Sequence, residues 1–252
     1  MGDGDLKTRL FVKQDLREGS QIILSKEQVH YLRNVLRLRE GDNIALFNGR
    51  DGEWETKIVS IDKKNVHVCA KTCIRPQELT ADVWLIFAPI KGLRVDFIAQ
   101  KATELGANML CPVFTEHTSV KKINVERLLS NAIEAAEQSG RLSVPQINSP
   151  VILEKLIEDW PKERFLFCCD ETGGGEPILG AFKKNNGPAG LLIGPEGGFS
   201  NKELDQLDKL SNVCRVSLGR KILRSDTAAF AALVCWQAAI GDWNAPKDKP
   251  ND

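Results

Sequence analysis

Short apolar runs alternate with longer amphipathic segments through the chain after residue 80. The apolar runs predict strands at 83–88, 109–114, 165–169, 191–193 and 213–218. The amphipathic segments predict helices at 93–105, 125–138 and 227–240, and another that begins after Ser200. Strands and helices that alternate in this way build a mostly parallel sheet with helices on both faces. We therefore expect an α/β domain.

Residues 1–75 show a different pattern, in which short strand-like runs are separated by turn signals. The runs are 9–12, 21–24, 43–47, 54–61 and 66–73. Asn-Gly and Asp-Gly pairs between the third and fourth runs are strong hairpin signals. Ser25 and Gln28 form a capping box, which predicts a helix ending near Arg37. The pattern predicts a small β-barrel at 1–75, and the break at Arg75–Glu78 starts a second domain at 76–252.

Two loops that follow predicted strands carry the clearest chemical signal. The first is Gly194–Gly198, whose glycines lack the Cβ atoms that would keep a ligand away from the main chain. It ends at a capping box of Ser200 and Glu203. In the second loop Gly219 ends the strand, and Ser225 or Asp226 can cap the helix at 227–240. Open α/β sheets bind ligands at the edge where such loops meet, so we expect a ligand there.

Composition excludes several classes of protein. The chain has no apolar run long enough to cross a bilayer, and its polar amino terminus lacks the basic start and apolar core of a signal peptide. Seven cysteines occur without a C-x-x-C pair, which argues for reduced thiols and against a zinc site or a disulfide framework. We expect a cytoplasmic protein with no membrane and no metal.

The two loops together resemble a known family. The sequence Gly194-Pro195-Glu196-Gly197-Gly198, followed by Leu218-Gly219 and by 222–224 leading into Thr227, resembles the RsmE family of the SPOUT superfamily. These enzymes are ribosomal RNA uridine-N3 methyltransferases that use S-adenosylmethionine. Further matching segments are 30–37, 91–92, 101–106 and 137–141, so the resemblance spans nearly the whole chain. Asp226 departs from the pattern, which more often has glutamate there.

The resemblance implies a fold and a cofactor site. The fold is a SPOUT-type knotted parallel sheet with helices on both faces, preceded by a PUA-like β-barrel that holds RNA. The cofactor is S-adenosyl-L-methionine, and its expected contacts are Leu192, Ile193, Gly194, Gly198, Leu218, Gly219, Ile222, Leu223 and Thr227. SPOUT enzymes are typically homodimers that pair through the last helix. The apolar helix at 227–240 suits such burial, and it could equally be a core helix of a monomer.

Methylation of uridine N3 requires that its proton leave as the new bond forms. A base could accept the proton, or a cation could stabilise the uracil anion. Arg224 follows the second loop directly and is the first candidate to steady the base or its charge. Glu196 could accept a proton or orient Arg224. The alternatives are a salt bridge for Arg224 and hydrogen bonds from backbone N–H groups for Glu196.

Any contact with 16S rRNA must come from a local patch, because the formal net charge is zero. Arg33 and Arg37 are four residues apart and would share a helix face, with Arg9 on a neighbouring strand. Arginines can grip phosphates or stack on an unpaired base. Lys91 and Arg94 are candidate phosphate or base contacts in the second domain. A solvated surface is the alternative at each of these positions.

Several functions stay open or are excluded at this stage. The sequence lacks a G-x-G-x-x-G dinucleotide fingerprint, a phosphate-binding P-loop and a nucleophile–histidine constellation. The expected substrate is 16S rRNA or the small ribosomal subunit. A SPOUT methyltransferase for tRNA or another ribosomal nucleotide is the nearest alternative, and a non-catalytic RNA-binding assembly protein is the alternative of another class.

Overall fold

The computed structural model describes residues 6–92, 94–172, 174–185 and 187–244. These residues form two compact units. One contains the chain up to residue 79 together with 136–144, and the other contains 80–135 together with the chain from 145 onward. The predicted boundary between residues 75 and 76 stays a prediction. The inclusion of 136–144 in the first unit is a feature that no sequence signal indicated.

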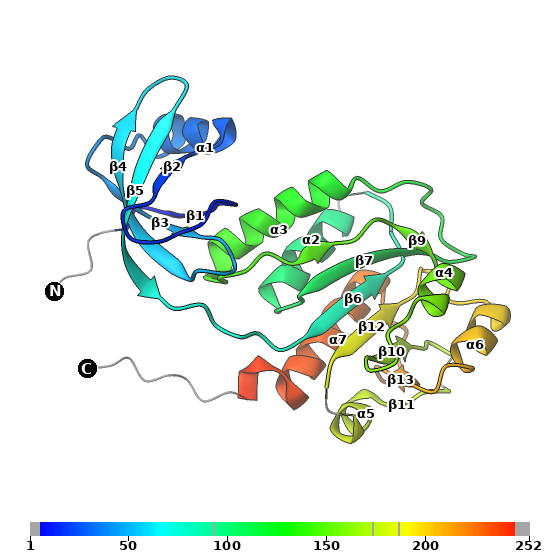
Figure 1. Ribbon diagram of the computed structural model, residues 1–252. Helices are drawn as coiled ribbons and strands as arrows, with labels where there is room; N and C mark the ends of the chain where they lie inside the picture. The colour runs from blue at the N-terminus through cyan, green and yellow to red at the C-terminus, as the bar shows by residue number, and fades with distance from the viewer. Residues whose placement is uncertain (1–5, 93, 173, 186, 245–252) are drawn as a thin grey trace. The chain divides into compact units, whose positions relative to one another are not determined.

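In the described part of the first unit, five strands form one curled sheet, a half-barrel (Figure 1). In spatial order they are β1 (Arg9–Phe11), β3 (Asn43–Phe47), β4 (Glu53–Ile61), β5 (Val66–Arg75) and β2 (Gln21–Ile23). β1 pairs with β3 in parallel, and the other pairs are antiparallel. The strands lie where the turn signals predicted them, and the predicted barrel is open between β1 and β2.

The predicted helix near Arg37 is shorter than expected. The Ser25–Gln28 capping box is confirmed, but helix α1 (Lys26–His30) passes into a π-helical turn at Tyr31–Val35. Arg37 then adopts a left-handed conformation with φ of 57°. Leu36 and Leu38 both pack against the core of the unit, which a continuing α-helix could not allow because residues two apart point in nearly opposite directions. Arg33 and Arg37 therefore do not share the face of one α-helix.

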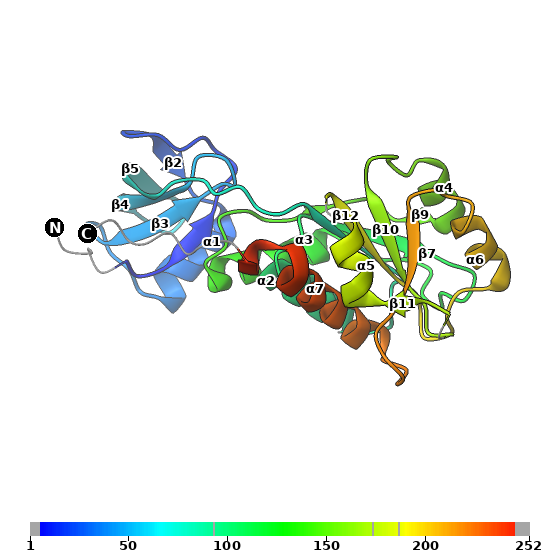
Figure 2. The same cartoon turned by 90° about the horizontal axis from the view of Figure 1, so that it is seen from below.

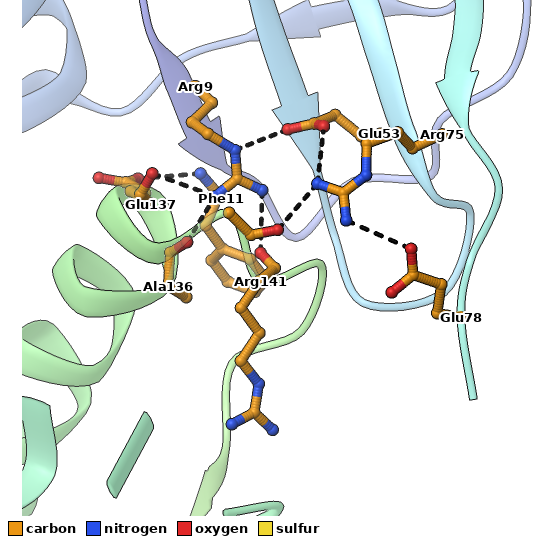
Figure 3. A network of polar contacts seen from close by, with 9 residues as sticks. Arg9, Phe11, Glu53, Arg75, Glu78, Ala136, Glu137 and Arg141 are labelled. Atoms are coloured by element: carbon orange, nitrogen blue, oxygen red, sulfur yellow. Dashed lines mark hydrogen bonds and ion pairs between the residues drawn. The ribbon is translucent and has the colours of Figure 1, made fainter. Parts of the chain in front are cut away.

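Arg9 is held inside the first unit by four acceptors (Figure 3). Its Nε donates to the Glu53 carboxylate at 2.6 Å. Its other two nitrogens donate to main-chain carbonyls at 2.5–3.0 Å, those of Ala136, Glu137 and Arg141. Its guanidinium carbon also lies 4.3 Å from the centre of the Phe47 ring. These contacts attach the segment 136–144 to β1.

Glu53 is the anionic centre of this network. The residue is only 5% exposed, and its second oxygen lies 3.4 Å from the Arg75 guanidinium. Arg75 in turn donates to the Gly140 carbonyl at 2.8 Å. One buried carboxylate therefore balances two arginines that both bind the segment 136–144.

The second unit is built on a sheet in which every described pairing is parallel. The spatial order is β11 (Glu176–Pro177), β13 (Val213–Ser217), β10 (Phe165–Cys169), β12 (Ala189–Ile193), β6 (Val83–Phe87), β7 (Met109–Phe114) and β8 (Gln146–Ile147), and β9 (Val151–Ile152) also pairs with β7. The predicted α/β domain with a parallel sheet is confirmed. The short strands β8, β9 and β11 were not predicted, because two residues show no period.

Helices cover both faces of this sheet, as predicted (Figures 1 and 2). One face packs against α2 (Arg94–Glu104), α3 (Val125–Ser139), α5 (Ile178–Lys184) and α7 (Ser225–Ile240). The other face packs against α4 (Leu153–Glu158) and α6 (Asn201–Leu207). A short 3₁₀ turn at Asp242–Asn244 follows α7. In β12, Leu191 and Ile193 face the first group and Leu192 the second, because strand side chains alternate.

Two expectations fall partly outside this description. The helix predicted from Leu93 begins at Arg94, and residue 93 lies outside the described residues. The trefoil knot that the resemblance implies stays a prediction, because strand order and register do not record how the backbone threads.

Replacing Glu53 by alanine should destabilise the first unit by about 2–4 kcal/mol. Removing one partner of a buried ion pair costs about 3–5 kcal/mol, and Arg9 and Arg75 keep some solvent contact that lowers this figure. Amide hydrogen exchange in β3 and β4 measures the effect in this unit alone. Asp15→Ala removes an exposed partner of Arg50 and should cost less than about 1 kcal/mol. Equal losses in the two variants would contradict the central role of Glu53.

Candidate active site

A cavity of about 350 Å³ opens at the carboxyl edge of the parallel sheet. Its floor contains Cys169, Ile193 and Val216, which lie at the ends of β10, β12 and β13. Its walls are the loops that leave these three strands, at 170–172, 194–196 and 217–223, together with the start of α7. This is the position at which ligands bind in open α/β sheets.

The structure brings the two predicted loops together. Both line this cavity, and the hydroxyl of Ser225 donates to the carbonyl of Gly194 at 2.8 Å. Ser225 is 6% exposed, so this bond is shielded from water. The predicted cap of α7 was wrong: the N-cap residue is Arg224, and its side chain makes no capping bond. Ser225 is used to tie one loop to the other.

Most of the residues expected to contact a cofactor line the cavity. These are Ile193, Gly194, Leu218, Gly219, Ile222 and Leu223. Leu192 is buried on the other face of the sheet, since strand side chains alternate. Gly198 and Thr227 are not among the residues that line the cavity.

The glycines of the first loop are needed for packing against the protein. A Cβ on Gly194 would lie 2.9 Å from the Phe199 ring, and one on Gly197 would lie 3.1 Å from His117 Cβ. Gly198 has φ of 69°, and its Cβ would overlap the Glu171 carboxylate. Protein packing therefore requires these glycines by itself, and close approach of a ligand to their main chain stays a prediction. Gly219 differs, because a Cβ there would meet no atom within 4 Å although the residue lines the cavity.

The first loop is held in place by His117, which sequence reasoning missed, and by Glu203, which was predicted only as part of a capping box. His117 lies with Nδ1 3.0 Å from the carbonyl of Gly197 and 3.1 Å from that of Gly198. Glu203, 3% exposed, accepts from the Ser200 N–H at 2.9 Å and from the Glu116 N–H at 2.8 Å. The Ser200–Glu203 capping box is confirmed, and it also anchors the loop after β7. No local signal could reveal contacts between residues 80 or more positions apart.

Charged side chains surround the cavity on several sides. Glu196 lines it and lies 3.5 Å from the guanidinium of Arg94, and the two side chains are 44% and 43% exposed. Arg224 is exposed and stands between Leu223 and Ser225, which both line the cavity. Arg220 and Lys221 line it and are also exposed. Cationic groups therefore adjoin the opening on the side of the second loop.

The loop after β10 is a further part of the site that was not predicted to bind a ligand. Asp170, Glu171 and Thr172 line the cavity directly after Cys169. The Asp170 carboxylate is buried, accepts from the Thr172 N–H at 2.9 Å and lies 3.5 Å from Arg215. The sequence signal was available, because this loop follows a predicted strand of the same parallel sheet.

The predicted RNA contacts are divided between the units. Arg33 and Arg37 are exposed in the first unit, whereas the guanidinium of Arg9 is occupied by internal acceptors. Lys91 is exposed in the second unit, and Arg94 is paired with Glu196.

Residues 6–244, apart from 93, 173 and 186, contain no group of three His, Cys, Asp or Glu side chains suited to hold a metal ion. Helices in the same ranges are too short or too polar to span a bilayer.

Burial suppresses the reactivity of the thiol on the cavity floor. Burial, together with a smaller contribution from nearby Cys235, raises the pKa of Cys169 to about 12. Burial also raises the pKa of Cys111 to about 12. Since the thiolate is the nucleophile, these cysteines are chemically inert near neutral pH.

The chain matches two described families. Residues 77–237 match the RNA methyltransferase domain, and residues 24–68 match the RNA methyltransferase PUA domain. The chain is 34% identical to the ribosomal RNA small subunit methyltransferase E of Rickettsia conorii over 89% of this chain and 93% of that protein.

Two solved structures are similar over nearly their whole length. The ribosomal RNA small subunit methyltransferase E of Neisseria gonorrhoeae, bound to S-adenosyl methionine, has a TM-score of 0.86 and 28% identity, covering 94% of this chain and 99% of that one. A protein of Legionella pneumophila in complex with the same cofactor has a TM-score of 0.82 and 30% identity, covering 93% and 98%.

The native protein at pH 8 should react with a thiol reagent at exposed Cys73 and not at Cys169 or Cys111. With a pKa of about 12, only about one buried thiol in 10⁴ is ionised at that pH. Mass spectrometry of labelled peptides measures the difference, and denaturation in urea should abolish it. Equal labelling of Cys169 and Cys73 in the native protein would contradict the burial of the cavity floor.

Proposed function

Because the chain belongs to the family of the ribosomal RNA small subunit methyltransferases E, we propose that it methylates N3 of a uridine in 16S rRNA with S-adenosylmethionine. One observation carries the proposal: the two loops whose sequence resembles the RsmE family meet around a single cavity at the sheet edge. Assembly of the small subunit takes place in the cytoplasm, where we propose that the enzyme acts.

The cavity fits a nucleoside cofactor. Its floor and walls offer apolar surface from Ile193, Leu218 and Leu223 for a flat heterocycle, together with main-chain groups at Gly194 and Gly219. The space that a Cβ on Gly219 would occupy is empty, which supports a close approach of the ligand to the backbone there. When bound, S-adenosylmethionine supplies a methyl group on a cationic sulfur that a nitrogen nucleophile can accept.

The chain supplies alignment and charge control beside the cavity. We assign to Arg224 the role of steadying the uracil ring and the negative charge left when N3 loses its proton. Glu196 lines the cavity and is placed to accept that proton or to orient a cation, and Arg94 holds it at 3.5 Å. The Arg94–Glu196 ion pair also connects α2 to the first loop.

The RNA contacts that we propose are the exposed cations Arg33 and Arg37 in the first unit and, in the second, exposed Lys91 and half-buried Arg94, which is paired with Glu196. Arg9 has a structural role, because its donors already bind Glu53 and three carbonyls.

Mapping of modified nucleosides tests the substrate. Ribosomal RNA from cells that lack the protein should lose one N3-methyluridine from 16S rRNA, which mass spectrometry of nuclease fragments detects. Loss of a modification from tRNA or from another ribosomal nucleotide would contradict this substrate and identify that nucleotide as the one methylated. Calorimetry that shows no binding of S-adenosylmethionine would favour a non-catalytic RNA-binding protein.

Arg224→Ala should lower turnover by about 10²–10³-fold, the usual loss when a group that stabilises developing charge is removed. Affinity for S-adenosylmethionine should stay within about tenfold, or 1.4 kcal/mol, because the side chain does not line the cavity. Single-turnover methylation and calorimetry measure the two effects. Arg224→Lys keeps the charge and should recover part of the turnover. Unchanged turnover in the alanine variant would remove Arg224 from the mechanism.

We also propose that the enzyme is a homodimer that pairs through α2 and α7. Phe97 is 44% exposed and Val234 37% exposed, which leaves apolar surface on both helices. Phe97 packs edge-on against Phe230, with 5.4 Å between the ring centroids, so α2 and α7 together form one apolar surface. A second copy could cover it in a symmetric contact.

Light scattering at micromolar concentration should give twice the mass of one chain, which is 28.0 kDa. Val234→Asp should shift the protein to a monomer, because a carboxylate in an apolar interface is unpaired. Leu179→Asp is the matched control, since Leu179 is 49% exposed and belongs to α5, outside the two helices of the proposed interface. A wild-type monomer at every concentration would contradict the dimer.

A further inference from the structure

Besides the cavity described above, the second unit has a cleft beside the first turns of α2 and α3. Its volume is about 330 Å³, and it is lined by the loop after β6, by Val120 and residues 122–124, and by both helices. Asp96 of α2 accepts from Arg127 and Asn131 of α3, so the two helices are joined there. All the elements that form the cleft belong to the second unit.

Two cations in this cleft are not neutralised. Lys91 and Lys122 line it, both are exposed, and within the described part of the chain neither has an ion-pair partner. The third cation, Arg127, is bound to Asp96 at 2.5 Å. The cleft therefore carries two unpaired positive charges, which favour an anionic ligand.

Apolar side chains also line the cleft, beside Asp96 and Asn124. They come from the same two loops and include Pro89, Ile90, Val120 and Ile123. An apolar surface flanked by ammonium groups suits a nucleotide, whose sugar and base offer apolar faces and whose phosphate carries the charge. The volume is close to the 350 Å³ of the first cavity, which holds a nucleoside in the proposed function.

The cleft also adjoins the first cavity. Arg94 stands between Lys91 and Val95, which line the second cleft, and reaches Glu196, which lines the first. A chain of nucleotides that places one base at the first cavity can place a neighbour over the second.

We propose that this cleft binds a nucleotide of the substrate RNA that flanks the methylated uridine, with Lys91 and Lys122 on its phosphates. The proposal rests on the proposed function and extends it, because it assigns to Lys122 and to the apolar cleft a role in holding RNA. It requires that RNA bind to the catalytic unit as well as to the PUA-like unit.

The test compares RNA binding by the full-length wild type and the double variant Lys91→Ala/Lys122→Ala, using protein-free 16S rRNA between about 50 and 200 mM salt. The variant should bind at least about tenfold more weakly at the low salt concentration. The slope of log affinity against log salt should fall by about 1.5, since each phosphate contact contributes about 0.7–0.9. Affinity for S-adenosylmethionine should not change, which also shows that the variant is folded.

Two single-lysine controls separate a built cleft from diffuse charge. Lys121 is exposed next to Lys122 and does not line the cleft, and Lys162 is exposed before β10, at the opposite edge of the sheet. Lys122→Ala should weaken binding severalfold more than Lys121→Ala or Lys162→Ala. An equal loss with Lys121→Ala, or wild-type affinity and slope in the double variant, would overturn the proposal.

The binding measurement does not need catalysis, so it separates two failures. A wild type that binds RNA through the cleft and methylates no uridine would defeat the proposed function alone. Competition with polyglutamate adds a further outcome: if the double variant loses affinity for polyglutamate and keeps it for RNA, the cleft binds acidic peptides and the proposal is overturned.

Discussion

The parallel register of β10, β12 and β13 is the constraint on which the cavity of the second unit depends. β12 is buried along its whole length, and its pairing places Ile193 opposite Cys169, which is opposite Val216 in turn. Three neighbouring strand ends therefore form one floor, and their connections must leave at one edge. A slip of one residue in β12 would turn Leu192 toward the cavity and Ile193 toward α6, exchanging the two faces of the sheet.

The first loop is shaped by protein contacts before any ligand arrives. Phe199, His117 and Glu171 occupy the space beside its glycines, and Ser225 ties it to the second loop. Contacts of this kind fix a loop during folding, so less conformational entropy is lost when a ligand binds. The Gly-rich sequence thus indicates a rigid loop, whereas glycine by itself would suggest a flexible one.

Most local signals in the sequence were informative, although the predicted cap of α7 and the predicted α-helix as far as Arg37 were wrong. Strand positions, both capping boxes and the pairing of two glycine loops at one edge follow from period and spacing. The missed features depend on contacts between distant residues: His117 on the first loop and Glu53 between two arginines. The sequence also could not predict which arginines are exposed. Arg9 donates to internal acceptors and Arg33 is exposed, although nothing in the local sequence distinguishes them.

The hydrogen-bond partners of the two capping boxes explain why one box ends in Gln28 and the other in Glu203. Gln28 accepts from Ser25 with its oxygen and donates from its nitrogen to the carbonyl of Phe11 at 2.7 Å, so its neutral amide meets one donor and one acceptor. Glu203 faces two N–H groups, those of Ser200 and Glu116. An amide there would turn NH₂ toward N–H, leaving two hydrogen-bond donors facing each other in a buried place. The choice between two nearly isosteric side chains is thus set by the polarity of a distant loop.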